Sequence, residues 1–270
     1  VIDYYNDLVE LTFGEDRWVR AVQFIPGDPS VLHHVLTYVV PESESFIPGQ
    51  EIGEAAPPPR QGGNVASGLN SRKFLEGYAP GKIDAMTFPE DTGVFVPKGH
   101  KLAMQFHYTT NGKATTDKTL LGLYFYDKEK PPAHEYLNSA VATMFKIPPY
   151  AIEDKEVAHQ TFQEAVVLYG MRAHMHFRGK RMEFTVEYPD GRKEMLLSVP
   201  NYSYSWQPTY QLETPVTLPA GTKVYVTGAF DNSIHNPANP DPSKELSFGL
   251  QSWDEMFIGY LAYYKLEPEG

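Results

Sequence analysis

Short hydrophobic runs separated by turn-forming residues make up most of this chain. The runs are rich in Val, Tyr, Phe and Thr, and Pro, Gly, Asn and Asp stand between them. No long segment keeps the hydrophobic period of about 3.6 residues that an amphipathic helix needs. The pattern therefore predicts an all-β protein.

The clearest runs predict four strands in each half of the chain. They span residues 17–25, 31–40, 101–110 and 118–126 in the first half, and 165–176, 181–188, 222–230 and 256–266 in the second. The sequence Pro189-Asp190-Gly191-Arg192 is a strong hairpin turn. Residues 41–97 carry too many turn signals to form one element, and we expect them to make a surface excursion.

A charged segment that ends in prolines, Asp127–Pro132, directly follows a predicted strand and is typical of a linker between domains. We place the boundary there, which gives an N-terminal domain of residues 1–130 and a C-terminal domain of residues 131–270. Many short strands in each half predict two antiparallel β-sandwich domains of the jelly-roll type, packed side by side.

Composition and charge limit the partners. The 270 residues are 41% hydrophobic, enough to bury a core in each domain. The 34 acidic residues outnumber the 23 Lys and Arg, and the net charge of -11 argues against a nucleic acid or an anionic membrane as partner. No apolar run approaches the roughly 20 residues of a membrane span. Because the chain has no Cys, any metal must be bound by His, Met or carboxylates.

The sequence His174-Met175-His176 lies at the end of a predicted strand. Side chains alternate across a strand, so the two imidazoles would project to one face at a spacing that suits a metal. Two exposed histidines without a metal are the alternative interpretation.

The first half contains the adjacent pair His33-His34 and, further along, His107. Neighbours on a regular strand point to opposite faces, so His33 and His34 could share a metal only at a bulge or a strand end. His107 is flanked by hydrophobic residues and could equally be a hydrogen-bonded core residue. Together the three histidines could form a copper or zinc site.

Met256 opens the last predicted strand, where a methionine would ordinarily be core packing. A thioether binds soft metal ions, and among biological first-row ions that indicates Cu(I) rather than zinc. If Met256 is a ligand, the metal is copper.

The order of these motifs resembles that of the copper type II, ascorbate-dependent monooxygenase family, which includes peptidylglycine α-hydroxylating monooxygenase and dopamine β-monooxygenase. The resemblance runs from about Val19 to Tyr264. It rests on the segments VLHHV (31–35), MQFHY (104–108), RAHMHFRGK (172–180) and DEM (254–256). As a set, these motifs are specific to the family.

The resemblance implies two coppers per chain, one in each domain. The ligands of an electron-transfer copper would be His33, His34 and His107. The ligands of an oxygen-binding copper would be His174, His176 and Met256. Such enzymes hydroxylate an unactivated C–H bond with dioxygen and an external one-electron reductant such as ascorbate. Two coppers would store the two electrons that this reaction needs besides those of the C–H bond.

Two further residues match family positions beside the oxygen-binding copper. Arg172 would lie on the same strand face as His174 and matches the family's substrate-anchoring arginine, whose guanidinium could hold a carboxylate. Tyr260 matches a tyrosine that lines the same pocket, although its position in a strand would also suit a core aromatic residue. A small-molecule or peptide-like substrate is implied.

The second half is closer in style to bacterial members of the family, for example at Val199-Pro200-Asn201-Tyr202 and Phe230-Asp231-Asn232-Ser233. The resemblance therefore implies a secreted protein of the bacterial periplasm or exterior, with a fused or partner redox domain, because such relatives often lie beside one. The animal enzymes are braced by disulfides, which a chain without Cys cannot form. Their fold could survive that loss on core size alone, but the resemblance does not imply that this chain shares their particular substrates.

Two interpretations without catalysis stay open at this point. A copper-binding or copper-storage module would use the same His and Met residues, but it has no need for two different sites or for Arg172. A carbohydrate- or protein-binding β-sandwich would leave the histidines incidental and would use exposed aromatic residues, among them Trp18, Trp206 and Trp253. Catalysis is the preferred interpretation.

Overall fold

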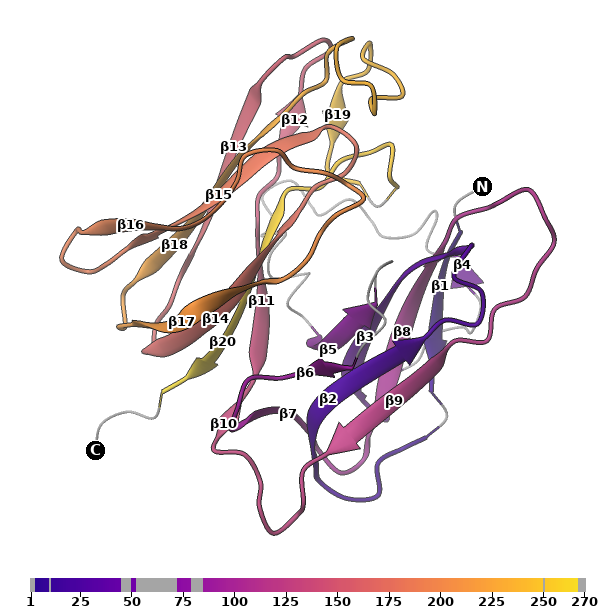
Figure 1. The fold of residues 1–270 in the computed structure, drawn as a ribbon, viewed down its shortest axis with the longest axis vertical. Helices are drawn as coiled ribbons and strands as arrows, with labels where there is room; N and C mark the ends of the chain where they lie inside the picture. Colours follow the sequence, from indigo (N-terminus) through magenta and orange to yellow (C-terminus); the bar gives the residue numbers. More distant parts are fainter. Residues whose placement is uncertain are drawn as a thin grey trace. The chain divides into compact units, whose positions relative to one another are not determined.

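The computed structural model describes residues 3–9, 11–44, 50–51, 72–78, 85–249 and 251–266 (Figure 1). All the regular secondary structure among these residues is β-strand, which confirms the all-β prediction. The chain divides into two compact units that meet in sequence between Leu137 and Asn138.

Two sheets form the first unit. Its strands are β1 (Asp3–Leu8), β2 (Arg17–Ile25), β3 (Leu32–Pro41), β4 (Gln50–Glu51), β5 (Lys73–Tyr78), β6 (Met86–Thr87), β7 (Thr92–Val96), β8 (His100–Tyr108), β9 (Leu120–Phe125) and β10 (His134–Glu135). One sheet has the order β4-β1-β8-β3-β5, and the other has the order β10-β7-β2-β6 with β9 paired to β2. The described registers in this unit are antiparallel, apart from that of β10 with β7.

The second unit is built from two four-stranded sheets and a short two-stranded one. Its strands are β11 (Leu137–Ala142), β12 (Lys146–Ile147), β13 (Asp154–Thr161), β14 (Val166–His174), β15 (Gly179–Glu187), β16 (Lys193–Val199), β17 (Tyr210–Leu218), β18 (Lys223–Phe230), β19 (Leu246–Ser247) and β20 (Ile258–Lys265). The four-stranded sheets have the orders β11-β20-β14-β17 and β13-β18-β15-β16, and Figure 1 shows them as two layers.

Alternation of buried and accessible residues explains why these segments are strands. Along β15, Met182, Phe184 and Val186 are fully buried, while the residues between them reach the surface. The buried faces of both layers contribute to one core, and a Cβ added to Gly259 of β20 would lie 2.5 Å from Val226 and 2.7 Å from Phe184 of the other layer. The glycine thus allows the two layers to approach closely.

All eight predicted strands were placed to within two residues, and the segment 17–25 coincides with β2. Two ends were predicted wrongly. β14 stops at His174 instead of continuing to residue 176, and β20 starts at Ile258, so Met256 precedes the strand. The predicted linker Asp127–Pro132 is followed by β10, which still pairs with β7 of the first unit. The stretch 41–97 lies partly outside the described residues, but β5 and β7 within it belong to the sheets.

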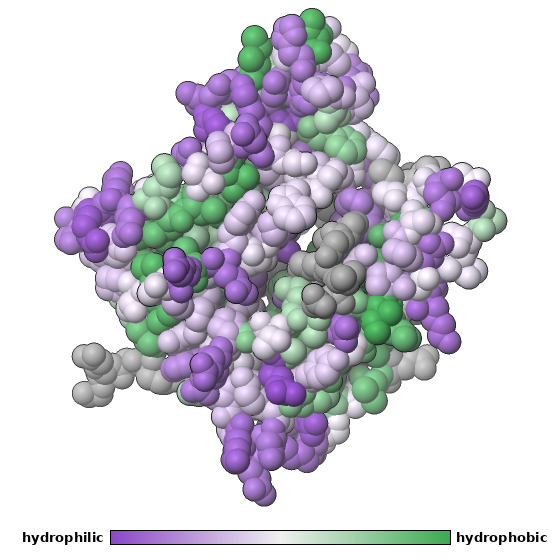
Figure 2. Space-filling view, viewed as in Figure 1, coloured by the Kyte–Doolittle hydropathy of each residue, from purple (hydrophilic) through white to green (hydrophobic). Residues whose placement is uncertain are grey.

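Hydrophilic and hydrophobic residues are interspersed on the face drawn in Figure 2, and strongly hydrophilic residues project at its edges. None of the described segments forms a helix long and apolar enough to cross a membrane.

Candidate metal centres

The three histidines of the first unit converge at the neighbouring strands β3 and β8. His34 and His107 are cross-strand partners, and the register of the two strands shifts between Leu32 and His34. Adjacent histidines can share a metal only at such an irregularity, because it allows the side chains of both His33 and His34 to turn toward His107. The ring centroids of His33 and His34 lie 4.9 Å and 4.7 Å from that of His107.

The nitrogen atoms of this cluster are close enough to bind one ion. The Nδ1 atom of His34 lies 3.2 Å from Nδ1 of His33 and 3.3 Å from Nδ1 of His107, and the potential ligand atoms of the three rings all lie within 4.8 Å of one another. Burial lowers the pKa of His33, which favours the neutral imidazole that binds a metal. His107 is completely buried. The donor set fits copper, and by its chemistry alone it fits zinc as well.

His174 ends β14, and its ring is held by a neutral side chain. Its Nδ1 lies 2.7 Å from Oε1 of Gln207, whose Nε2 in turn donates to the carbonyl oxygen of Tyr204 over 2.8 Å. Because the amide of Gln207 is oriented in this way, it presents its oxygen to the imidazole. His174 therefore carries its proton on Nδ1 and has Nε2 available as a ligand.

His176 lies beyond the end of β14 and is held from the segment before β20. Its Nδ1 lies 3.2 Å from the carbonyl oxygen of Asp254, and its backbone N–H donates to Oε2 of Glu255 over 2.8 Å. Between the two histidines, the N–H of Met175 donates to the hydroxyl of Tyr202, which donates to the carbonyl oxygen of Met175. The prediction that both imidazoles share one face of a strand was wrong, because the strand has ended. The rings still lie 5.3 Å apart.

Met256 supplies a sulfur atom to the same place. Its Sδ lies 3.3 Å from Nε2 of His174, on the side of the ring opposite Gln207. Two imidazoles and one thioether thus converge from β14, the segment after it and the segment before β20. This mixed nitrogen and sulfur set fits copper better than zinc, because the thioether favours Cu(I).

Arg172 and Tyr260 lie next to this second centre. They are cross-strand partners on β14 and β20, and the Cζ atom of Arg172 lies 4.4 Å from the centre of the Tyr260 ring. Tyr260 is 6.3 Å from the His174 ring, centre to centre. Arg172 and His174 are both accessible while Ala173 between them is buried, so the two share one face of the strand. No ion pair joins Arg172 to a carboxylate among the described residues.

The motifs indicated the candidate ligands but not the residues that hold these side chains in place. Gln207, Glu255, Arg178 and Tyr202 had no predicted role, although Glu255 and Arg178 stand inside two of the quoted motifs. Arg178 and Glu255 differ from most of the other charged residues in their burial, because Arg178 is only 1% exposed and Glu255 is 0% exposed. The sequence alone carries no sign that these two charges meet.

Comparison with known proteins bears on the second unit. Residues 143–269 match the family described as copper type II ascorbate-dependent monooxygenase, C-terminal domain. No curated protein matches the chain.

Among solved structures, the chain is similar to the major capsid protein P2 of bacteriophage PM2, with 9% identity over 100% of both chains and a TM-score of 0.37. It is also similar to the VP2 subviral particle of infectious bursal disease virus, with 8% identity, 98% of this chain, 71% of that chain and a TM-score of 0.28. TM-scores this low support no conclusion about fold or function.

The family match covers the unit in which two imidazoles, a thioether and an arginine gather. It agrees with the resemblance that the motifs indicated. The second unit is thus similar to the C-terminal domain of the copper type II ascorbate-dependent monooxygenase family over residues 143–269.

Proposed function

We propose that this chain hydroxylates a C–H bond of a small or peptide-like substrate, with dioxygen and an external reductant such as ascorbate, at two copper sites. The observation that carries the proposal is the distance of 3.3 Å between Nε2 of His174 and Sδ of Met256, beside the ring of His176. A thioether in a histidine site selects Cu(I), the state that reacts with dioxygen.

Each unit would hold one copper. The residues of the first site are His33, His34 and His107, and those of the second are His174, His176 and Met256. When bound, the two coppers would supply the two electrons and the activation of dioxygen that monooxygenation requires. Hydrogen bonds to Oε1 of Gln207 and to the carbonyl oxygen of Asp254 orient the imidazoles of His174 and His176 before any metal arrives.

The substrate would be anchored by Arg172. Its guanidinium stacks on the Tyr260 ring, which limits the rotation of the guanidinium and presents its N–H groups on the same strand face as His174. Trp206 and Trp253 are 68% and 47% exposed and directly adjoin Gln207 and Asp254 in the sequence. They support a substrate that combines an anionic group with an apolar part.

The same proposal places the protein in the bacterial periplasm or outside the cell, where a fused or partner redox domain could replace ascorbate as the electron donor. The family match supports the use of a reductant without identifying it.

The variant Met256→Ile tests the proposed function. Ile roughly preserves the volume of Met but removes the sulfur ligand, so the fold and the three-histidine site should persist while oxygen-dependent turnover is lost. Copper analysis, thermal unfolding and oxygen uptake with ascorbate are measured on both proteins across carboxylate-bearing substrates. Full activity in the variant would show that Met256 is only a packing residue. Two coppers without any oxygen uptake in the wild type would indicate a storage protein instead.

A further inference from the structure

We propose that Arg178 and Glu255 form a positioning pair for the second copper site. The pair fixes the two backbone segments that carry His176 and Met256, which lie 80 residues apart in the sequence. The inference rests on the proposed function, since it concerns how that site is kept in shape. Neither residue supplies a metal ligand in the proposal.

Glu255 joins the two segments through its carboxylate. Its Oε2 accepts the backbone N–H of His176 over 2.8 Å, and its Oε1 accepts the backbone N–H of Arg178 over 2.7 Å. Glu255 itself directly precedes Met256 in the sequence. One side chain thus accepts the backbone N–H groups of a proposed ligand and of Arg178, and it joins their segment to the one that carries Met256.

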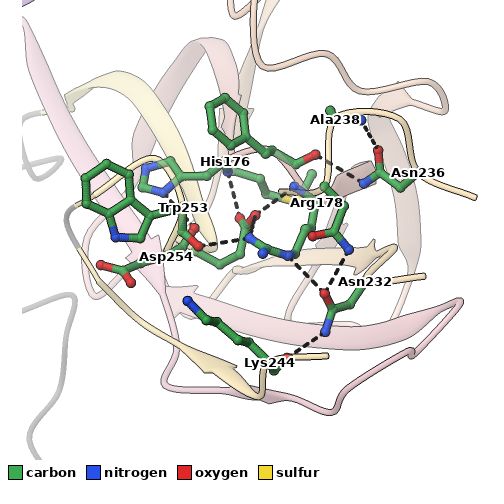
Figure 3. Close-up of polar contacts among 12 residues, drawn as sticks. His176, Arg178, Asn232, Asn236, Ala238, Lys244, Trp253 and Asp254 are labelled. Atoms are coloured by element: carbon green, nitrogen blue, oxygen red, sulfur yellow. Dashed lines mark hydrogen bonds and ion pairs between the residues drawn. The ribbon is translucent and has the colours of Figure 1, made fainter. Parts of the chain in front are cut away.

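Arg178 links this carboxylate to the surrounding loops. Its Nη1 lies 3.8 Å from Oε1 of Glu255 and donates to the carbonyl oxygen of Trp253 over 2.9 Å. Its Nε donates to Oδ1 of Asn232 over 3.0 Å, and Asn232 donates to the carbonyl oxygens of Pro148 and Lys244. Figure 3 shows the Arg178 side chain between His176 and Asn232, with these bonds around it.

The burial of the pair favours a positioning role over simple stabilisation. Both side chains are almost completely removed from solvent, and a well-packed apolar pair would usually be at least as stable as a buried ion pair. What an apolar pair cannot do is accept the backbone N–H groups of His176 and Arg178 and so join their segment to the one that carries Met256. The geometry therefore ties the position of His176 and Met256 to the ionic pair.

Four full-length variants test the proposal. Glu255→Gln keeps the shape but turns an NH2 group toward a backbone N–H. Arg178→Met removes the guanidinium and leaves the Glu255 charge buried alone. The double variant, Arg178→Met with Glu255→Gln, removes both charges. Val186→Ala is the matched control, because Val186 is a fully buried core residue that contacts neither proposed ligand segment in the described hydrogen bonds.

Two properties are measured on each protein: melting temperature, and the affinity of the second site for Cu(I) in competition with a Cu(I) chelator. Sulfur scattering in the X-ray absorption spectrum identifies that site. We expect Glu255→Gln and Arg178→Met to weaken binding there by about 10- to 100-fold, the usual effect of losing a partner of a metal ligand. The double variant should regain melting temperature, because no lone charge is buried, but it should not regain affinity.

The proposal is overturned if the double variant regains both the melting temperature and the Cu(I) affinity of the wild type. It is equally overturned if Val186→Ala lowers the melting temperature as far as Glu255→Gln does and weakens copper binding to the same extent. It is also overturned if Glu255→Gln binds Cu(I) within about twofold of the wild type. If Arg178→Met does not fold, Arg178→Lys takes its place, since Lys keeps the charge but cannot make both the Asn232 and Trp253 contacts. A wild-type protein without sulfur-bound copper would instead refute the proposed function itself.

Discussion

At the scale of single residues, both proposed histidine ligands of the second centre are oriented by neighbours that are not ligands. Gln207 holds the ring of His174, and the carbonyl oxygen of Asp254 holds that of His176. These partners determine which ring nitrogen is available, so they deserve the same tests as the ligands.

Replacing Gln207 with Leu should weaken the second copper site by about 10- to 100-fold, because the His174 ring loses its hydrogen-bond acceptor. In the metal-free protein, nitrogen NMR of His174 should show a shift away from the tautomer with the proton on Nδ1. Gln207→Glu should retain that tautomer and lower the copper reduction potential, since a carboxylate makes the imidazole a stronger donor. Unchanged NMR spectra in Gln207→Leu would show that the amide does not orient the ring.

Replacing Arg172 with Lys should weaken the binding of the substrate in the transition state by about 1–3 kcal/mol, because Lys keeps the charge and loses the planar fork. Copper content should stay the same. The measurements are steady-state kinetics and the melting temperature, with Arg181→Lys as control, since Arg181 pairs with Glu153 at the surface of the same unit. A lower melting temperature with unchanged kinetics would assign Arg172 a structural role.

Residue chemistry explains why the sequence predicted the candidate ligands and not their supports. His-x-His, His-His and Asp-Glu-Met are recognisable because metal-binding side chains are few and their spacing is short. Gln207 lies 33 residues from His174, and its role depends on a turn in which the N–H of Trp206 donates to the carbonyl oxygen of Ser203. Nothing in the local sequence around a glutamine signals such a contact.

At the scale of elements, the ends of strands were harder to predict than their centres. β14 ends at His174 because the backbone of Met175 bonds to the Tyr202 hydroxyl instead of to a neighbouring strand. β17 was missed because most of its residues are exposed, so its sequence lacks the hydrophobic alternation of a half-buried strand. Both features depend on tertiary contacts.

The strand β13 carries a carboxyl group whose titration should affect stability. Burial, and next the charge of Asp154, raise the pKa of Glu156 from 4.5 to about 7. Because the folded state holds this proton more tightly, the contribution to stability is fully present below about pH 4.5 and is lost as the pH rises through about 7.

Replacing Glu156 with Gln should therefore stabilise the second unit at pH 8, by up to about 3 kcal/mol, and should give little gain at pH 4.5. Urea unfolding at the two pH values measures the difference. Glu153→Gln is the control, because Glu153 is paired with Lys180 and Arg181, which lower its pKa, and its loss should not stabilise the protein at pH 8. An equal gain from Glu156→Gln at both pH values would contradict the assignment.

At the scale of the whole molecule, the two candidate centres share no ligand and lie in different compact units. The all-β class was predictable because alternation and turn signals recur throughout the chain. The boundary between the two units was not predictable from the sequence. β10 (His134–Glu135) follows the predicted linker, yet it is held in the first unit by a parallel pairing with β7, a strand far from it in the sequence.

The separation of the centres predicts that the two coppers can be lost independently. The reconstituted wild type should bind two coppers, and His107→Ala should keep about one, with its sulfur scattering intact. His176→Ala should lose the other one. Metal analysis and X-ray absorption test this expectation. Loss of both coppers in His107→Ala, or full occupancy by zinc that copper cannot displace, would argue against two independent copper sites.

The second centre is held together by hydrogen bonds and a buried ion pair, and the chain has no cysteine. A dithiol reductant cleaves disulfide bonds by transferring two electrons to them. In this protein those electrons have no sulfur–sulfur bond to break. The framework around the proposed ligands should therefore be the same in a reducing medium as in an oxidising one.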